Sequence, residues 1–300
     1  MIRKIIVVIL GLLGITDLSA TIKVSGVFAD NMVIQRDAPV RVWGWGDKGE
    51  PVTVIFNGQS QRTRTDNDGY WELRLKEMPF GGPYEMTVSG KSNEIKIKNI
   101  LIGDVWVCSG QSNMEFPVAR DPNVKWKTGI LNETEEMKDA DYPSIRLFHV
   151  EHQLAPEGEK EDCIGRWLVC TPENVKEFSA VGFIFGRKLY KELQMPVGLI
   201  QSTWGGTHAE SWTERRVMKD NPLYADVMEE FAPQNVKREK DKCKVPATLW
   251  NGMIAPIKGY TIKGNIWYQG ESNSIRHEKY QKVFTNLINS WRQEWGQADM

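Results

Sequence analysis

The sequence has almost no excess of charge of either sign. It sets 38 Lys and Arg against 39 Asp and Glu in 300 residues, a formal net charge of -1. Binding to nucleic acid or to an anionic membrane depends on clustered basic side chains. The balance therefore predicts neither kind of partner and favours a small neutral or weakly acidic ligand.

Cysteine and histidine are scarce, with four of each. The absence of C-x-x-C and H-x-x-x-H spacings predicts that the chain has no metal site. The segment "DNDG" at 66–69 lacks the ligand spacing of a calcium loop and is predicted to be a turn. Cys163 and Cys170 either form a bridge across a short loop or remain free buried thiols, because spacing alone does not settle disulfide connectivity.

The apolar run at the N-terminus, residues 5–15, is too short to span a bilayer. Arg3 and Lys4 precede this run, and Leu18-Ser19-Ala20 follows it as a small-residue cleavage site. This order predicts a signal peptide over 1–20 and an exported protein, periplasmic or extracellular, that has no membrane attachment after cleavage. A buried N-terminal helix is the alternative.

Long helical patterns are lacking in residues 21–100. The runs "VRVWGWG", "PVTVIFNG", "YWELRLKEM" and "YEMTVSG" have β periodicity, and turn residues such as Asn57-Gly58 separate them. They predict a small antiparallel β-sandwich domain. Trp43 and Trp45 lie in one of these strands, where core packing is favoured and stacking on a sugar ring is the alternative.

Strands and helices alternate in residues 101–300. Strands are predicted at 100–110, 196–203 and 264–270, and a helix at 179–194 with Ser179 as N-cap. Residues 214–244 are predicted to form a surface helix and loop. A last helix is predicted from an apolar stripe of Ile275, Tyr280, Val283, Phe284, Leu287, Ile288, Trp291 and Trp295. The order predicts an α/β domain with a flavodoxin-like parallel sheet in three layers.

Each predicted strand of this second domain ends in a loop rich in glycine and polar side chains. The loops are "SGQSN" (109–113), "STWGGTHAESW" (202–212) and "YQGESN" (268–273). The carboxyl ends of parallel strands meet at one edge of a sheet, so these loops are expected to form one site. Ser112 is the candidate nucleophile. Candidate oxyanion donors are its own N–H, Gly205 or Gly206, and an amide from Gln269 or Asn273.

The motifs "GQSNM", "GGTHAESW" and "WYQGESN", behind a β-sandwich, resemble the sialate O-acetylesterase family of carbohydrate esterases in the SGNH hydrolase superfamily. The resemblance implies a serine esterase that removes O-acetyl groups from a carbohydrate, with sialic acid as the leading substrate, through an acetyl-Ser112 intermediate and without a cofactor. It favours Gln269 over Asn273 as the amide donor. Gln111, Asn113, His208 and Glu271 are possible substrate contacts or supports.

The other nucleophile and base candidates have simpler interpretations. Cys108 lies inside an apolar strand and is expected to be a small buried residue. His208 is expected to contact substrate or to be structural, His149 and His152 to border the pocket, and His277 to face solvent. The Asp-x-x-His segment that supplies the base in this superfamily is not among the 300 residues. We therefore expect the base to lie beyond Met300, the hydrolase domain to be incomplete, and this chain alone to have little activity.

Two other functions remain open at this stage. One is deacetylation of a plant polysaccharide such as xylan, because the three loops encode ester chemistry and not sugar identity. The other is non-catalytic carbohydrate binding through Trp43 and Trp45. The sequence does not show whether Arg120 or Arg215 reaches the pocket to bind the carboxylate of a sialic acid, and it does not predict the oligomeric state.

Overall fold

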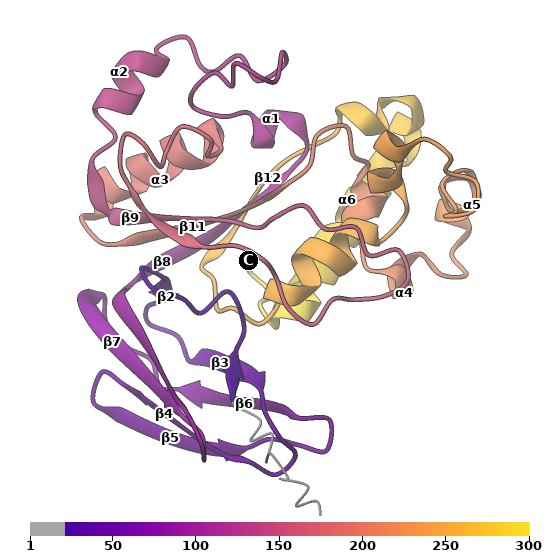
Figure 1. Ribbon diagram of the computed structural model, residues 1–300. Coiled ribbons are helices and arrows are strands. Elements are labelled where there is room, and N and C mark those ends of the chain that lie inside the picture. Colours follow the sequence, from indigo (N-terminus) through magenta and orange to yellow (C-terminus); the bar gives the residue numbers. More distant parts are fainter. Residues whose placement is uncertain (1–21) are drawn as a thin grey trace, which may run out of the picture.

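The computed structural model describes residues 22–300, so the predicted signal peptide over 1–20 lies outside the described residues. Figure 1 shows a group of strands from the N-terminal part below a sheet that is flanked by helices. No helix within residues 22–300 is long and apolar enough to cross a membrane.

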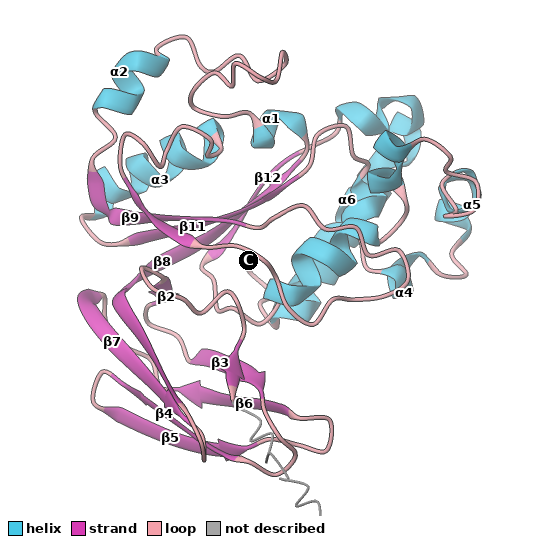
Figure 2. Ribbon diagram, in the orientation of Figure 1, coloured by secondary structure: helices cyan, strands magenta, loops and turns pink. Residues whose placement is uncertain are grey.

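The N-terminal part consists of strands in two sheets, as Figure 2 shows. Their pairings are antiparallel except at Val33–Gln35, which pairs parallel with residues 101–103. One sheet has the order β1-β3-β6, and in the other β4 pairs with both β5 and β7. The predicted hairpin at Asn57-Gly58 is confirmed, because both residues have positive φ and Phe56 pairs with Gln59. The sandwich packing of the two sheets stays a prediction. The strands are β1 (Lys23–Val24), β2 (Val33–Gln35), β3 (Val40–Trp45), β4 (Pro51–Phe56), β5 (Gln59–Arg64), β6 (Tyr70–Leu75) and β7 (Gly81–Ser89).

One long strand, β8 (Glu94–Gly110), belongs to both parts of the molecule. Its first half pairs antiparallel with β7, and its second half pairs parallel with β11 (Val197–Thr203) and β12 (Gly264–Tyr268). The predicted division of the chain at residue 100 falls inside this strand, and that division stays a prediction.

The C-terminal sheet has the order β10-β9-β11-β8-β12. Strands β9, β11, β8 and β12 are parallel, and β10 (Trp167–Cys170) is an antiparallel edge strand. The three predicted strands are present as β8, β11 and β12. Strand β9 (Tyr142–His149) was not predicted, because Pro143 and Arg146 interrupt its apolar pattern.

Helices cover both faces of this sheet. Leu199 of β11 belongs to the apolar cluster that contains Phe183 of α3 (Ala180–Leu193), whereas the next residue, Ile200, belongs to the cluster that contains Trp291 of α6 (His277–Trp295). Neighbouring residues of a strand point to opposite faces. The order is therefore helix, sheet, helix. The remaining helices are α1 (Ser112–Glu115), α2 (Glu133–Lys138), α4 (Arg215–Met218) and α5 (Ala225–Glu230).

The two predicted helices are confirmed with one correction. The Ser179 hydroxyl caps α3 by accepting a hydrogen bond from the Gly182 N–H at 3.0 Å. In α6 the stripe around Val283, Leu287 and Trp291 is buried. Ile275 was wrongly placed on this stripe. It lies in the preceding 3-10 turn and is 75% exposed. Because α6 begins only at His277, the helical periodicity does not extend to Ile275.

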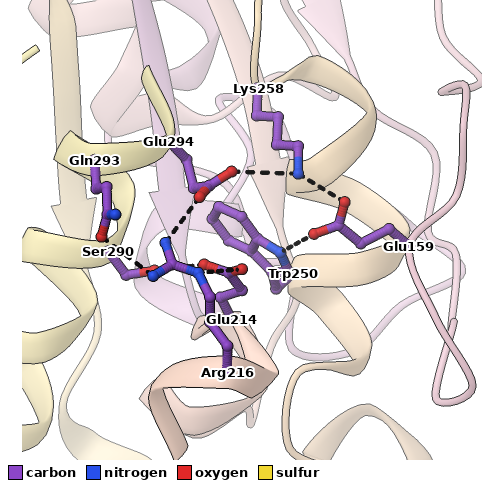
Figure 3. Close-up of polar contacts among 8 residues, drawn as sticks. All are labelled: Glu159, Glu214, Arg216, Trp250, Lys258, Ser290, Gln293 and Glu294. Carbon is purple, nitrogen blue, oxygen red and sulfur yellow. Dashed lines mark hydrogen bonds and ion pairs between the residues drawn. The ribbon is translucent and has the colours of Figure 1, made fainter. Parts of the chain in front are cut away.

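A network of charged and polar side chains joins α6 to the rest of the C-terminal part (Figure 3). The Lys258 ammonium lies 2.7 Å from Glu159 and 3.3 Å from Glu294, a residue of α6. Arg216 of α4 pairs with Glu294 at 2.8 Å, and the Trp250 indole N–H donates to Glu159 at 2.8 Å. The segment 214–244, predicted as one surface helix and loop, contains the short helices α4 and α5, and α4 takes part in this network.

We predict that Lys258→Met lowers the stability by about 1 kcal/mol and the Tm by about 2 °C. Burial by itself lowers the pKa of Lys258, but the hydrogen bond to Glu159 and the charges of Glu159 and Glu294 raise it above its ordinary value of 10.5. The ion-pair contribution is thus present below pH 10.5 and is lost as the pH rises through the higher folded-state pKa.

Thermal unfolding of both proteins at pH 7 and at pH 11 would measure this difference. Lys263→Met is the matched control, because Lys263 is exposed and has no ion pair within residues 22–300. Equal Tm values for the two variants at pH 7 would contradict the prediction.

Candidate active site

The three predicted loops converge at one edge of the sheet. Gly110, the last residue of β8, pairs with Thr203 at the end of β11 and with Tyr268 at the end of β12. Gly110 has φ +140°, and a Cβ there would lie 2.1 Å from the Tyr268 carbonyl oxygen, so only glycine fits. The Gln111 N–H donates to that same oxygen at 3.0 Å. The strand register therefore places the starts of all three loops side by side at the same edge of the sheet.

Ser112 begins α1 directly after this turn and is half-buried. A Cβ built on Gly205 would lie 3.4 Å from the Ser112 Cβ, so the second loop lies against the serine. Within the described part of the chain no hydrogen bond involves the Ser112 hydroxyl. The predicted nucleophile and the predicted glycine loop are neighbours, and their catalytic roles stay predictions.

The two candidate glycines differ in what their N–H groups do. The Gly205 N–H donates to a carboxylate oxygen of Glu115 at 2.5 Å. Gly206 is exposed, has φ +73°, and has no atom within 4 Å of a Cβ position. Its N–H has no protein partner within residues 22–300. Sequence reasoning missed Glu115, although it directly follows "GQSNM" and is only 7% exposed.

The candidate amides of the third loop hold the loops together. The Gln269 amide N–H₂ donates to Asn273 at 2.6 Å and to the Thr207 carbonyl at 3.1 Å, while its oxygen accepts from the Tyr280 hydroxyl at 3.0 Å. The Gln111 side-chain oxygen accepts from the Ser272 N–H at 3.2 Å. Gln111 is thus a support between the first and third loops.

Asn273 is 2% exposed and bridges the second and third loops. Its amide nitrogen donates to Glu210 at 2.8 Å, and its oxygen accepts from the Ala209 N–H at 3.0 Å. Burial raises the pKa of Glu210, while the hydrogen bond from Asn273 opposes that rise. Asn113 and Glu271 are exposed and joined by a hydrogen bond of 2.5 Å at the rim.

None of the four histidines makes a hydrogen bond with Ser112 in the described structure. His208 is 4% exposed and packs edge-on against Phe231; burial, then the charges of Lys244 and Arg276, lower its pKa to about 4. His277 is exposed, as predicted, and contacts the Ser274 carbonyl. His149, at the end of β9, lines a cavity of about 380 Å³.

His152 is the histidine that contacts the loops next to Ser112. Its Nε2 lies 2.9 Å from the Thr203 carbonyl oxygen and 3.4 Å from Glu115, and its ring stacks on Trp204 with centroids 4.0 Å apart. A carbonyl only accepts hydrogen bonds, so Nε2 carries the proton. This nitrogen therefore has no lone pair with which to take a proton from Ser112.

All four cysteines are free and buried, which leaves Cys163 and Cys170 as unpaired thiols. Burial raises the pKa of both to about 12. Cys108 is completely buried, and burial raises its thiol pKa well above the ordinary range. A protonated, inaccessible thiol is a poor nucleophile, so the interpretation of Cys108 as a small core residue agrees with the structure.

The remaining candidates lie away from Ser112 or already have protein partners. Trp43 is buried against Phe28. Trp45 is half-buried, and it lines a cavity of about 340 Å³ together with Tyr70. The Arg215 guanidinium donates to the Pro156 and Pro246 carbonyls. No group of three or more His, Cys, Asp or Glu within residues 22–300 is arranged to hold a metal ion.

Comparison with known proteins identifies the family. Residues 102–300 match the family described as carbohydrate esterase, sialic acid-specific acetylesterase. The chain belongs to this family. It is 33% identical over 319 residues to the mouse sialate O-acetylesterase, an alignment that covers 91% of this chain and 57% of the mouse protein. The human sialate O-acetylesterase is 35% identical over 290 residues, with 88% and 51% covered.

A solved structure gives the same result. The carbohydrate acetylesterase of Xanthomonas citri superposes with a TM-score of 0.78 at 32% identity, over 92% of this chain and 58% of that chain. The resemblance inferred from the three motifs is confirmed, and the α/β fold of a carbohydrate esterase with it. The chain spans about half the length of the curated relatives that it matches.

We predict that Asn273→Ala lowers the free energy of unfolding by about 2 kcal/mol at pH 7, because it leaves the Glu210 carboxylate and the Ala209 N–H buried without their partner. Loss of the amide should raise the pKa of Glu210 further. The deficit relative to wild type should then shrink as the pH falls and Glu210 takes up a proton.

Urea unfolding at pH 7 and at pH 4.5 measures both effects. Asn289→Ala is the matched control, because Asn289 is exposed on α6. A deficit for Asn273→Ala that is no larger than that of Asn289→Ala would show that the bridge contributes nothing.

Proposed function

We propose that this protein is a serine esterase that removes O-acetyl groups from a carbohydrate, with sialic acid as the leading substrate. The observation that carries the proposal is the position of Ser112. It lies at the start of α1, half-buried, beside the Gly205–Gly206 loop and at the level where three parallel strands end. The names of the family and of the similar proteins support the same chemistry.

In the proposed reaction the Ser112 hydroxyl attacks the acetyl carbonyl carbon. The oxyanion accepts hydrogen bonds from the N–H of Ser112 and from a glycine N–H of the second loop. Gln269 is the favoured third donor on the family resemblance, and to donate to the oxyanion its amide would exchange one of its hydrogen bonds, to Asn273 or to the Thr207 carbonyl. The sugar alcohol leaves with a proton, and water then hydrolyses the acetyl-serine ester to acetate.

We further propose that the general base is a histidine outside these 300 residues. Within residues 22–300, β12 pairs only with β8, so its other edge is available to a further strand. Helix α6 brings the chain back to the amino end of β12, where the Gln297 side chain donates to the Ile262 carbonyl at 2.9 Å. A right-handed connection would let the next strand run parallel to β12 and end beside Tyr268.

We also propose how the protein is exported and how its domains are ordered. Residues 1–20 would direct export to the periplasm or the cell exterior, and an N-terminal β-sandwich would precede a flavodoxin-like SGNH hydrolase domain. Acetylated xylan is the alternative substrate within the same chemistry. Glycan binding without catalysis is the second candidate function, and the half-buried Trp45 and Tyr70 beside the 340 Å³ cavity favour it.

The nucleophile is tested in the full-length protein with a fluorophosphonate probe and an acetyl ester substrate. We predict that Ser112→Ala abolishes labelling and lowers kcat by about a millionfold, as loss of a triad member does. The 300-residue chain should fold and turn over acetyl esters at a rate lower by a similar factor. Turnover by this chain that Ser112→Ala removes would contradict the proposed external base.

The substrate is tested by comparing kcat/KM of the full-length enzyme on O-acetylated sialic acid and on acetylated xylan. We predict a preference for the sialic acid ester of at least about tenfold, equal to about 1.4 kcal/mol of transition-state binding. A preference for xylan would assign the chain to the polysaccharide alternative. Retained glycan binding with no turnover of either ester would support the binding-protein alternative.

A further inference from the structure

Glu115 is a buried carboxylate for which the proposed acyl transfer has no use. It is the last residue of α1, three positions after Ser112, and is 7% exposed. A buried carboxylate is costly unless hydrogen bonds compensate it. One oxygen accepts the Gly205 N–H at 2.5 Å, and the other lies 3.4 Å from His152 Nε2. Its partners thus come from the loops that follow β11 and β9.

His152 lies beside this carboxylate and contacts the residues that precede Gly205. Its Nε2–H points at the Thr203 carbonyl, 2.9 Å away, and the ring stacks on Trp204 with an interplanar angle of 10°. Thr203 and Trp204 directly precede Gly205 in the chain. The histidine and the glutamate therefore hold three consecutive residues of the second loop from one side.

This arrangement assigns different tasks to the two glycines. The Gly205 N–H is occupied by Glu115, so it cannot also donate to an oxyanion without breaking a charge-assisted hydrogen bond. Gly206 comes next, has φ +73°, and has an N–H with no protein partner in the described residues. Its open surroundings, with nothing within 4 Å of a Cβ position, leave space for a ligand.

We propose that Glu115 is a positioning residue of the esterase site. Its carboxylate holds the Gly205 N–H, and this contact sets the loop so that the Gly206 N–H donates to the acetyl oxyanion. The proposal rests on the proposed esterase function and assigns the oxyanion role to the second glycine of the pair. It also accounts for the buried acid next to the nucleophile.

The experiment compares Glu115→Gln with Glu115→Met in the full-length enzyme. Glutamine keeps an oxygen that accepts the Gly205 N–H, and methionine has a similar volume without an oxygen. We expect Glu115→Met to lower kcat by about 100- to 1,000-fold, as loss of one oxyanion donor does, with KM changed less than about threefold. Glu115→Gln should stay within about tenfold of wild type.

Asp104→Asn is the matched structural control. Asp104 is also a buried carboxylate, 3% exposed, and it pairs with Arg36 at 3.0 Å. It lies on β8, eight residues before Ser112 in the chain. This variant is expected to lower the Tm while kcat stays unchanged. Inhibition by phenylboronic acid, which forms a tetrahedral serine adduct, should weaken in Glu115→Met in parallel with kcat.

The experiments distinguish a failure of the Glu115 proposal from a failure of the esterase proposal. If Gly205 were the oxyanion donor, Glu115 would compete for its N–H, and Glu115→Met would keep or raise kcat; that result would overturn the inference. Equal losses in the Gln and Met variants would overturn it as well, because the acceptor would then not matter. Unchanged activity of Ser112→Ala would instead overturn the esterase proposal, whatever Glu115 does.

Discussion

The site depends on the register of one strand. Strand β8 pairs antiparallel with β7 over its first half and parallel with β11 and β12 over its second half, and its last residue, Gly110, lies level with Thr203 and Tyr268. A slip of one residue would turn every side chain to the opposite face of the sheet. It would also separate Ser112 from Gly205. The register of β8 thus sets the distance between Ser112 and the Gly205–Gly206 loop.

Above the sheet, the loops are held by buried polar side chains. Asn273 and Gln269 tie the third loop to the second, and Glu115 ties the second loop to α1. Such groups are costly to bury and stabilise only when their hydrogen bonds are complete. Here each bond joins segments that are far apart in the chain. The loops are therefore held together by hydrogen bonds between distant segments, and the proposed stabilisation of an oxyanion requires donors that are fixed in this manner.

Much of this arrangement could be predicted from local patterns. The three loop-ending strands, the N-cap at Ser179 and the hairpin at Asn57-Gly58 follow from periodicity and turn chemistry, and the motif trio identified the family. Features that depend on tertiary contacts could not be predicted. Ile275 fits the helical stripe, yet it lies outside α6, because the 3-10 turn carries Asn273 to its buried partners before the helix begins. Strand β9 was missed because of Pro143 and Arg146.

The division of tasks between the candidate site residues also depends on tertiary contacts. The sequence did not distinguish Gly205 from Gly206, and it favoured Gln269 over Asn273 only through the family resemblance, because the hydrogen-bond partners of these groups come from distant segments. The structure distinguishes them: Gly205 and Asn273 bond to buried carboxylates, Glu115 and Glu210, whereas Gly206 and Gln269 are more accessible. The N–H groups bound to buried anions hold their loops. The Gly206 N–H has no protein partner within residues 22–300, whereas the Gln269 amide donates to Asn273 and to the Thr207 carbonyl. The two buried acids thus distinguish, through their hydrogen bonds, groups that the sequence alone leaves chemically alike.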